Sequence, residues 1–182
     1  MAASRTSIAD EGGISNFIND FLAKFEKIDR IGSTVEKEDM AFELANNTFD
    51  LDWMGNFILG KYRKELSEEK KRDFIINYSK SLVKNYIPIL GVYKKDNYKI
   101  LSVEPQAKDN VYNVATIVKI DGKDVKNDFR IVKKDNDYYV TDIIVEGVSF
   151  ISAQRTEINS IISSGNFDEF MRNLQMENSG ND

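Results

Sequence analysis

The segment from Tyr138 to Glu146 places one carboxylate in an otherwise apolar and β-branched run. Asp142 lies two residues after Val140 and two before Ile144, and in a regular strand all three side chains point to the same face. A carboxylate in apolar surroundings has a raised pKa and can act as a general base. It can equally accept hydrogen bonds from the backbone or pair with an arginine, and so fix the sheet. We expect the structural role, because the sequence shows no second catalytic group to work with it.

Few other side chains in the sequence are suited to catalysis. The chain has no His and no Cys, which removes the commonest general base, the commonest metal ligand and the thiol nucleophile. The sequence also has no Gly-rich phosphate loop, no nucleophile elbow and no pair of acids at metal-binding spacing. We therefore expect a protein that is not an enzyme, with no catalytic residue, no metal and no cofactor.

Basic residues provide two candidate binding features. Arg155 is expected to pair with Asp142 or Glu146, or else to contact an anionic head group or a partner. A second group is interspersed with glutamates and consists of Lys61, Arg63, Lys64, Lys70, Lys71 and Arg72. We expect it to form a solvated face; the alternative is steering toward anionic lipid. The formal net charge of −5 argues against a nucleic-acid partner.

Helical periodicity covers residues 14–95 and returns at 148–175. Apolar residues spaced three and four apart predict a core-facing first helix over residues 14–28. Shorter helices are expected over residues 37–46 and from Trp53 to about Gly60. Ser67 is a typical N-cap for a long helix that Pro88 should interrupt. A closing helix should run from Ser149 to Gly165, followed by a last short helix.

The region between these helical parts predicts a meander of four strands, over residues 98–104, 111–120, 125–132 and 138–146. Asp121-Gly122-Lys123 and the segment 134–137 have turn chemistry, so the strands should be antiparallel neighbours. The fold class is therefore α+β, with helices packed on a curved, cone-shaped sheet of the nuclear-transport-factor-2 and cystatin type that encloses an apolar cavity. At 182 residues we expect one domain over residues 14–176, a disordered or added leader over 1–13, and a flexible tail over 177–182.

Several segments together resemble one protein family. The run from Asp142 to Ser149, DIIVEGVS, followed by Arg155 and Gly165, is similar to the C-terminal signature of the MlaC family. The other matching residues are Phe49-Asp50, the segment Leu59–Arg63, and Phe74, Tyr86, Leu90 and Tyr93. The resemblance extends over residues 14–176, with the one departure that Tyr138 stands where the family usually has Trp.

The resemblance implies a phospholipid carrier of the Gram-negative periplasm. Proteins of this family, also called toluene-tolerance auxiliary proteins, are auxiliary components of an ABC transport system. They carry phospholipid between an outer-membrane lipoprotein–porin complex and the lipid-handling ring of an inner-membrane ABC transporter, and so maintain outer-membrane asymmetry. The implied ligand is a phospholipid, and the implied location is the periplasm, for a mature chain whose export signal is absent from this sequence.

Such a carrier needs an apolar compartment for acyl chains. Two chains exposed to water cost on the order of 20 kcal/mol, at about 0.8 kcal/mol for each CH₂. The residues predicted to line the compartment are Trp53, Phe57, Tyr86, Leu90, Val114, Val118, Phe129, Ile131, Val140 and Ile144. Two alternatives are a small-molecule enzyme of a cone-shaped α+β fold with Asp142 as general base, and an interaction adaptor with a filled core.

Overall fold

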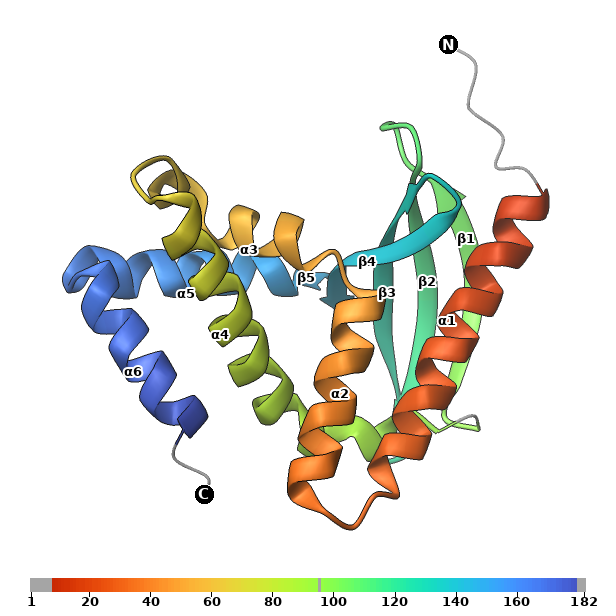
Figure 1. Ribbon diagram of the computed structural model, residues 1–182. Coiled ribbons are helices and arrows are strands. Elements are labelled where there is room, and N and C mark those ends of the chain that lie inside the picture. The colour runs from red at the N-terminus through yellow and green to blue at the C-terminus, as the bar shows by residue number, and fades with distance from the viewer. Residues whose placement is uncertain (1–7, 95, 180–182) are drawn as a thin grey trace.

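Five antiparallel strands form one open sheet in the order β1-β2-β3-β4-β5, with helices on one face and beside one edge (Figure 1). The computed structural model describes residues 8–94 and 96–179. The helices are α1 (Ile8–Asp29), α2 (Thr34–Thr48), α3 (Leu51–Leu59), η1 (Gly60–Lys64), α4 (Glu68–Tyr86), η2 (Ile87–Val92), α5 (Phe150–Ser164) and α6 (Phe167–Ser179). The strands are β1 (Tyr98–Pro105), β2 (Val111–Ile120), β3 (Lys123–Lys134), β4 (Asp137–Val145) and β5 (Val148–Ser149). The predicted α+β class is confirmed.

Tight turns hold the strands in the predicted meander. Asp121 and Gly122 both have positive φ, 50° and 77°, as a two-residue hairpin requires. The same geometry recurs at Glu146 and Gly147, where φ is 48° and 82°. That second turn adds β5, so the prediction of four strands was one strand short. The turn also explains how a strand leads into a helix here: the chain folds back for two residues, and Ser149 then caps α5 by accepting a bond from Ser152 N.

A bulge in β4 changes which side chains share a face. Ile131 pairs with Val140, but the preceding residue Arg130 pairs with Asp142, so Thr141 is the extra residue on β4. Val140 therefore faces the helices, whereas Asp142 lies on the opposite face. The expectation that Val140 and Asp142 share one face was wrong for this reason.

The helices begin and end where capping chemistry directs them. Ser67 accepts a hydrogen bond from Lys70 N at the start of α4, as predicted, and α4 ends at Tyr86, before Pro88. Helix α1 begins at Ile8, so residues 8–13 are helical, and α6 continues to Ser179. None of the helices within residues 8–94 and 96–179 combines the length and the apolar composition needed to cross a bilayer.

Apolar side chains form two separate cores. The first lies between the sheet and helices α1 and α2, and includes Ile18, Leu22 and Phe129. The second lies among α3, α4, α5 and α6, and includes Ile58, Phe74 and Ile158. In Figure 1 the second group of helices stands beside the sheet rather than over it. Phe49, at the end of α2, packs against both cores and marks the junction between them.

Candidate functional site

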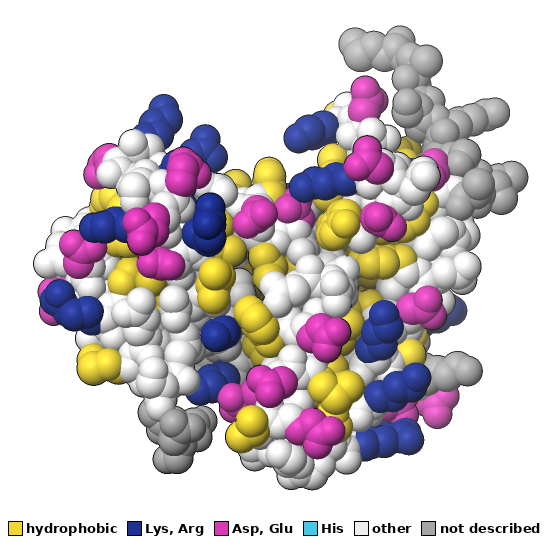
Figure 2. All heavy atoms as spheres, viewed as in Figure 1, with side chains coloured by type: hydrophobic (Ala, Val, Ile, Leu, Met, Phe, Trp, Pro, Cys, Tyr) yellow, Lys and Arg dark blue, Asp and Glu magenta, His cyan; other side chains and the backbone are white. Residues whose placement is uncertain are grey.

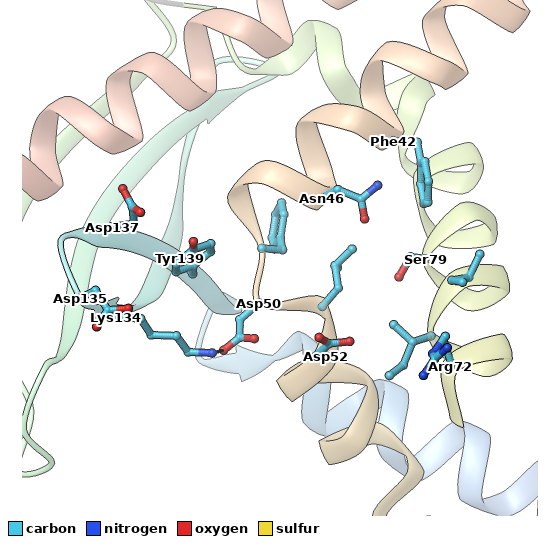
Figure 3. Close-up of a pocket in the computed structure, with 14 residues that line it drawn as sticks. Phe42, Asn46, Asp50, Asp52, Arg72, Ser79, Lys134, Asp135, Asp137 and Tyr139 are labelled. Atoms are coloured by element: carbon cyan, nitrogen blue, oxygen red, sulfur yellow. Dashed lines mark ion pairs between the residues drawn. The ribbon is translucent and has the colours of Figure 1, made fainter. Parts of the chain in front are cut away.

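A pocket of about 640 Å³ lies at this junction (Figure 3). It is bounded by the end of α2, the start of α3, one side of α4 and the hairpin between β3 and β4. The lining residues are Phe42, Asn46, Phe49, Asp50, Leu51, Asp52, Arg72, Ile75, Ile76, Ser79, Lys134, Asp135, Asp137 and Tyr139. This volume falls within the roughly 300–1,000 Å³ typical of small-molecule sites. Figure 2 shows the molecular surface from the viewpoint of Figure 1, and there hydrophobic side chains gather between α2 and α4 with charged side chains around them.

One wall of the pocket is apolar because α3 and α4 pack closely there. A Cβ added at Gly55 of α3 would lie 2.5 Å from Cγ1 of Ile75 on α4, so only glycine permits this approach. The close packing holds Ile75 in the wall, next to Ile76 of the same helix. Phe42 of α2, Phe49 and Leu51 add further apolar side chains to the lining.

The ring of Phe49 connects the pocket to the aromatic interior of the sheet core. Its centroid lies 5.5 Å from that of Phe21, in an edge-to-face arrangement. Phe21 in turn packs edge-to-face on Phe25 at 4.5 Å and on Phe129 at 6.3 Å. Phe49 is therefore shared by the pocket lining and the sheet core.

The opposite side of the pocket carries charge. Asp50 caps α3, its Oδ1 accepting from the backbone N–H of Trp53 at 3.4 Å, and its backbone N–H donates to Val140 O at 3.0 Å. Only 8% of Asp50 is exposed, and Lys134 Nζ lies 2.5 Å from its Oδ2 (Figure 3). This ion pair joins the end of β3 to the α2–α3 junction and forms one boundary of the opening.

Five residues of the predicted lining are buried on the helix-facing side of the sheet. These are Val114, Val118, Phe129, Ile131 and Val140, each at most 2% exposed. None of the five is among the residues that line the pocket. Their contact with lipid remains a prediction.

The other five lie elsewhere. Trp53 and Phe57 stack on the surface of α3 with ring centroids 5.4 Å apart, and Tyr86 packs edge-to-face on Phe150. Ile144 pairs with Asp128 on the far face of the sheet. Leu90 falls outside the residues whose side chains the structure describes.

Asp142 is fully buried and its oxygens are engaged by structural partners. Oδ2 accepts from Ser149 Oγ at 2.7 Å, Oδ1 accepts from the N–H of Ile151 at 3.2 Å, and Arg130 Nη1 lies 3.6 Å from Oδ2. The carboxylate therefore links β3, β4 and the first turn of α5. Because Asp142 does not line the pocket described above, the geometry offers it no substrate there.

The sequence suggested that Arg155 pairs with Asp142 or Glu146. The structure shows neither ion pair among the described residues. Within residues 8–94 and 96–179 Arg155 makes no ion pair, and its guanidinium lies 5.0 Å from the ring centroid of Phe57. Its Nε would be 2.9 Å from a Cβ at Gly60, whose φ is +57°. Arg155 therefore packs over the end of α3, and Arg130 is the cation that pairs with Asp142.

The basic residues near the α3–α4 connection have different surroundings in the structure. Lys70 pairs with Asp168 and Lys71 with Glu68, each at 2.7 Å, on the exposed surface. Arg72 differs from these lysines because it lines the pocket. Sequence reasoning missed the importance of Asp50, which appeared only in the Phe49-Asp50 pair of the family resemblance.

No group of three or more Asp, Glu, His or Cys side chains suited to hold a metal ion occurs in the described part of the chain. The arrangement is one apolar wall, one charged boundary and an aromatic ring leading to a larger apolar interior.

Comparisons with known proteins identify relatives of this chain. A family model described as MlaC protein matches residues 16–176. A solved structure of a phospholipid-binding protein from Ralstonia solanacearum, in complex with a phospholipid, has the same fold with a TM-score of 0.73. That match is 18% identical and covers 93% of this chain and 97% of the other. A comparison with curated protein sequences found no match.

Proposed function

This chain belongs to the MlaC family, and on that premise we propose that it binds a phospholipid in the pocket between its two cores and carries it through water. The observation that carries the proposal is the position of Phe49. This ring lies between a pocket with an apolar wall and a buried apolar sheet face. In this proposal Phe49 moves aside and the packed sheet core opens toward the pocket, which makes a compartment for acyl chains.

The energetics favour such a route. Each CH₂ moved from water into an apolar environment stabilises the complex by about 0.8 kcal/mol, so long acyl chains strongly favour any space that opens to them. The sheet is also long enough: β3 has 12 residues, which span about 40 Å at roughly 3.3 Å per residue. In this proposal the acyl chains lie against Val114, Phe129 and Val140, and the head group stays at the charged opening.

The wider role follows from the family as a proposal. We infer that the carrier works in the periplasm, exchanging phospholipid with an outer-membrane lipoprotein–porin complex and with the lipid-handling ring of an inner-membrane ABC transporter. Exchange between two apolar compartments is close to neutral in free energy, so the direction of transport has to come from these partners. Maintenance of outer-membrane asymmetry would be the result.

The enzyme alternative has no observation in its favour. It depended on Asp142 as an activated base, and this carboxylate accepts hydrogen bonds from Ser149 and Ile151 while it faces Arg130. The adaptor alternative required a completely filled interior, whereas a pocket of about 640 Å³ opens at the junction of the cores.

Lipid extraction tests the proposal. Protein purified without detergent should yield phospholipid in an organic extract, measured by mass spectrometry per mole of protein. Ile76→Trp should lower that yield several-fold, because Ile76 lines the pocket and is 42% exposed, so the larger ring fills the opening. Ile161→Trp is the matched control, since Ile161 is 41% exposed on α5 and does not line the pocket. Extracts without phospholipid, or equal losses in both variants, would refute the proposal.

A further inference from the structure

Charges of both signs surround the pocket, with negative charge in excess. Its lining contains four carboxylates, Asp50, Asp52, Asp135 and Asp137, and the cations are Arg72 and Lys134. Asp135 and Asp137 are exposed on the hairpin between β3 and β4, and Asp52 is exposed in the first turn of α3 (Figure 3). A head group at this opening therefore meets two cations within a net negative field.

The buried carboxylate limits how freely Lys134 can serve a ligand. Asp50 is almost fully buried, and its Oδ2 accepts no hydrogen bond of good geometry from the described residues; Lys134 Nζ, 2.5 Å away, supplies the compensating charge. A lipid phosphate that draws Lys134 outward leaves a buried charge without a partner, which is strongly unfavourable. A head group that brings its own cation restores the balance.

We propose that this arrangement selects phospholipids whose head group carries an ammonium beside the phosphate, over phospholipids with a net negative head group. The inference rests on the proposed function. The phosphate contacts Arg72 or Lys134, and the ammonium lies beside the carboxylates of Asp50, Asp135 or Asp137. A glycerol head group supplies the phosphate's negative charge and no cation, so the surplus of carboxylates repels it.

The expected size of the effect follows from Coulomb's law. One unit charge at about 10 Å from another, at an effective dielectric constant of about 20, changes binding by roughly tenfold. Screening at physiological salt, where the Debye length is about 8 Å, reduces this to about twofold. The preference should therefore weaken as salt is raised, unlike a preference that depends on head-group size.

A competition experiment with the full chain tests the inference. Delipidated protein is incubated with vesicles of equimolar phosphatidylethanolamine and phosphatidylglycerol of identical acyl chains, then separated, and its bound lipid is quantified by mass spectrometry. We expect about tenfold enrichment of phosphatidylethanolamine at low salt. The double variant Asp135→Asn with Asp137→Asn should bring the ratio of the two bound lipids close to one.

A matched control separates the pocket from overall charge. Asp121→Asn with Asp124→Asn makes the same change of net charge at the other end of β3, and neither residue lines the pocket. Both double variants alter one exposed turn aspartate with positive φ, 54° at Asp135 and 50° at Asp121, a conformation that asparagine also accepts. The control should keep the wild-type ratio.

The possible results are distinguishable. Bound lipid in the vesicle ratio, or an equal change in both double variants, overturns the inference and leaves the proposed function intact. Protein that binds neither lipid overturns the proposed function, and the inference with it. Enrichment that is lost only in the Asp135 and Asp137 variant supports both.

Discussion

Replacing Asp142 by asparagine should lower stability and leave the bound phospholipid in place. The carboxylate accepts from Ser149 Oγ and from the N–H of Ile151, and it faces Arg130 at 3.6 Å. An amide of the same shape can keep an acceptor for Ile151 and can donate to Ser149. What is lost is the negative charge, which strengthens both hydrogen bonds and interacts favourably with the N-terminal end of α5.

The magnitude follows from these contacts. A hydrogen bond to a charged group contributes about 1 kcal/mol more than a neutral one, and a charge at a helix N-terminus adds up to about 1 kcal/mol. The Arg130 pair adds little, because the side chain of Arg130 is 42% exposed to solvent. We expect Asp142→Asn to lower the free energy of unfolding by about 2 kcal/mol. Asp142→Leu should cost about 2–4 kcal/mol, because it leaves the buried N–H of Ile151 unsatisfied and removes the negative charge at the start of α5.

Urea unfolding provides the assay. Trp53 is the only tryptophan, and its ring stacks on Phe57, so its fluorescence reports on α3 while circular dichroism reports on the whole fold. Asp124→Asn, an exposed change on β3, should remain within about 0.5 kcal/mol of wild type. An Asp142→Asn variant as stable as that control would refute the structural role of the carboxylate. If Asp142→Asn abolished an enzymatic turnover without changing stability, the result would support Asp142 as a general base.

Three further predictions concern other parts of the molecule. Gly55→Ala should lower the free energy of unfolding by about 1–3 kcal/mol in thermal or urea unfolding, because its Cβ would lie 2.5 Å from a pocket-lining side chain. Gly12→Ala, with open space around it, should instead raise the free energy of unfolding by up to about 1 kcal/mol. Equal effects of the two substitutions would contradict this reasoning. Burial raises the pKa of Tyr78 above its ordinary value of 10, so the folded state keeps this proton longer and the free energy of unfolding should fall as pH rises above about 10. Tyr78→Phe should make the free energy of unfolding less dependent on pH above about 10, as measured from urea midpoints. A pH dependence equal to that of wild type would contradict this role of Tyr78. Lys134→Met should cost about 1–2 kcal/mol by leaving Asp50 without its cation, and adding Asp50→Asn should recover much of the loss in a double-mutant cycle.

Local chemistry explains which elements could be predicted from the sequence. Asp121-Gly122 predicted a hairpin because both positions must accept positive φ, and Ser67 predicted a helix start because its hydroxyl can cap α4. The strand β5 was not predicted because a strand of two residues is too short to show an alternation of apolar and polar side chains. The bulge at Thr141 escaped it because a β-branched residue suits a regular strand and a bulged one equally.

The pocket was harder to predict than the fold. Its lining comes from α2, α3, α4 and the β3–β4 hairpin, and the sequence does not show that Lys134 reaches Asp50. Sequence reasoning identified apolar positions well, since Val114, Phe129 and Val140 are all fully or almost fully buried. Hydrophobicity alone could not distinguish a filled core from a surface that meets a ligand. That distinction depends on tertiary packing around Phe49.

Cross-linking from within the bound lipid tests the central claim most directly. A phospholipid with a photoactivatable group midway along one acyl chain is loaded into the protein, irradiated, and the labelled peptides are identified by mass spectrometry. If acyl chains occupy the pocket and pass Phe49 into the sheet core, the label should fall on the apolar pocket wall around Ile75 and on the helix-facing side of the sheet around Phe129 and Val140. Labels confined to the exposed outer surfaces, such as Val148 of β5 or Met176 of α6, would contradict the account.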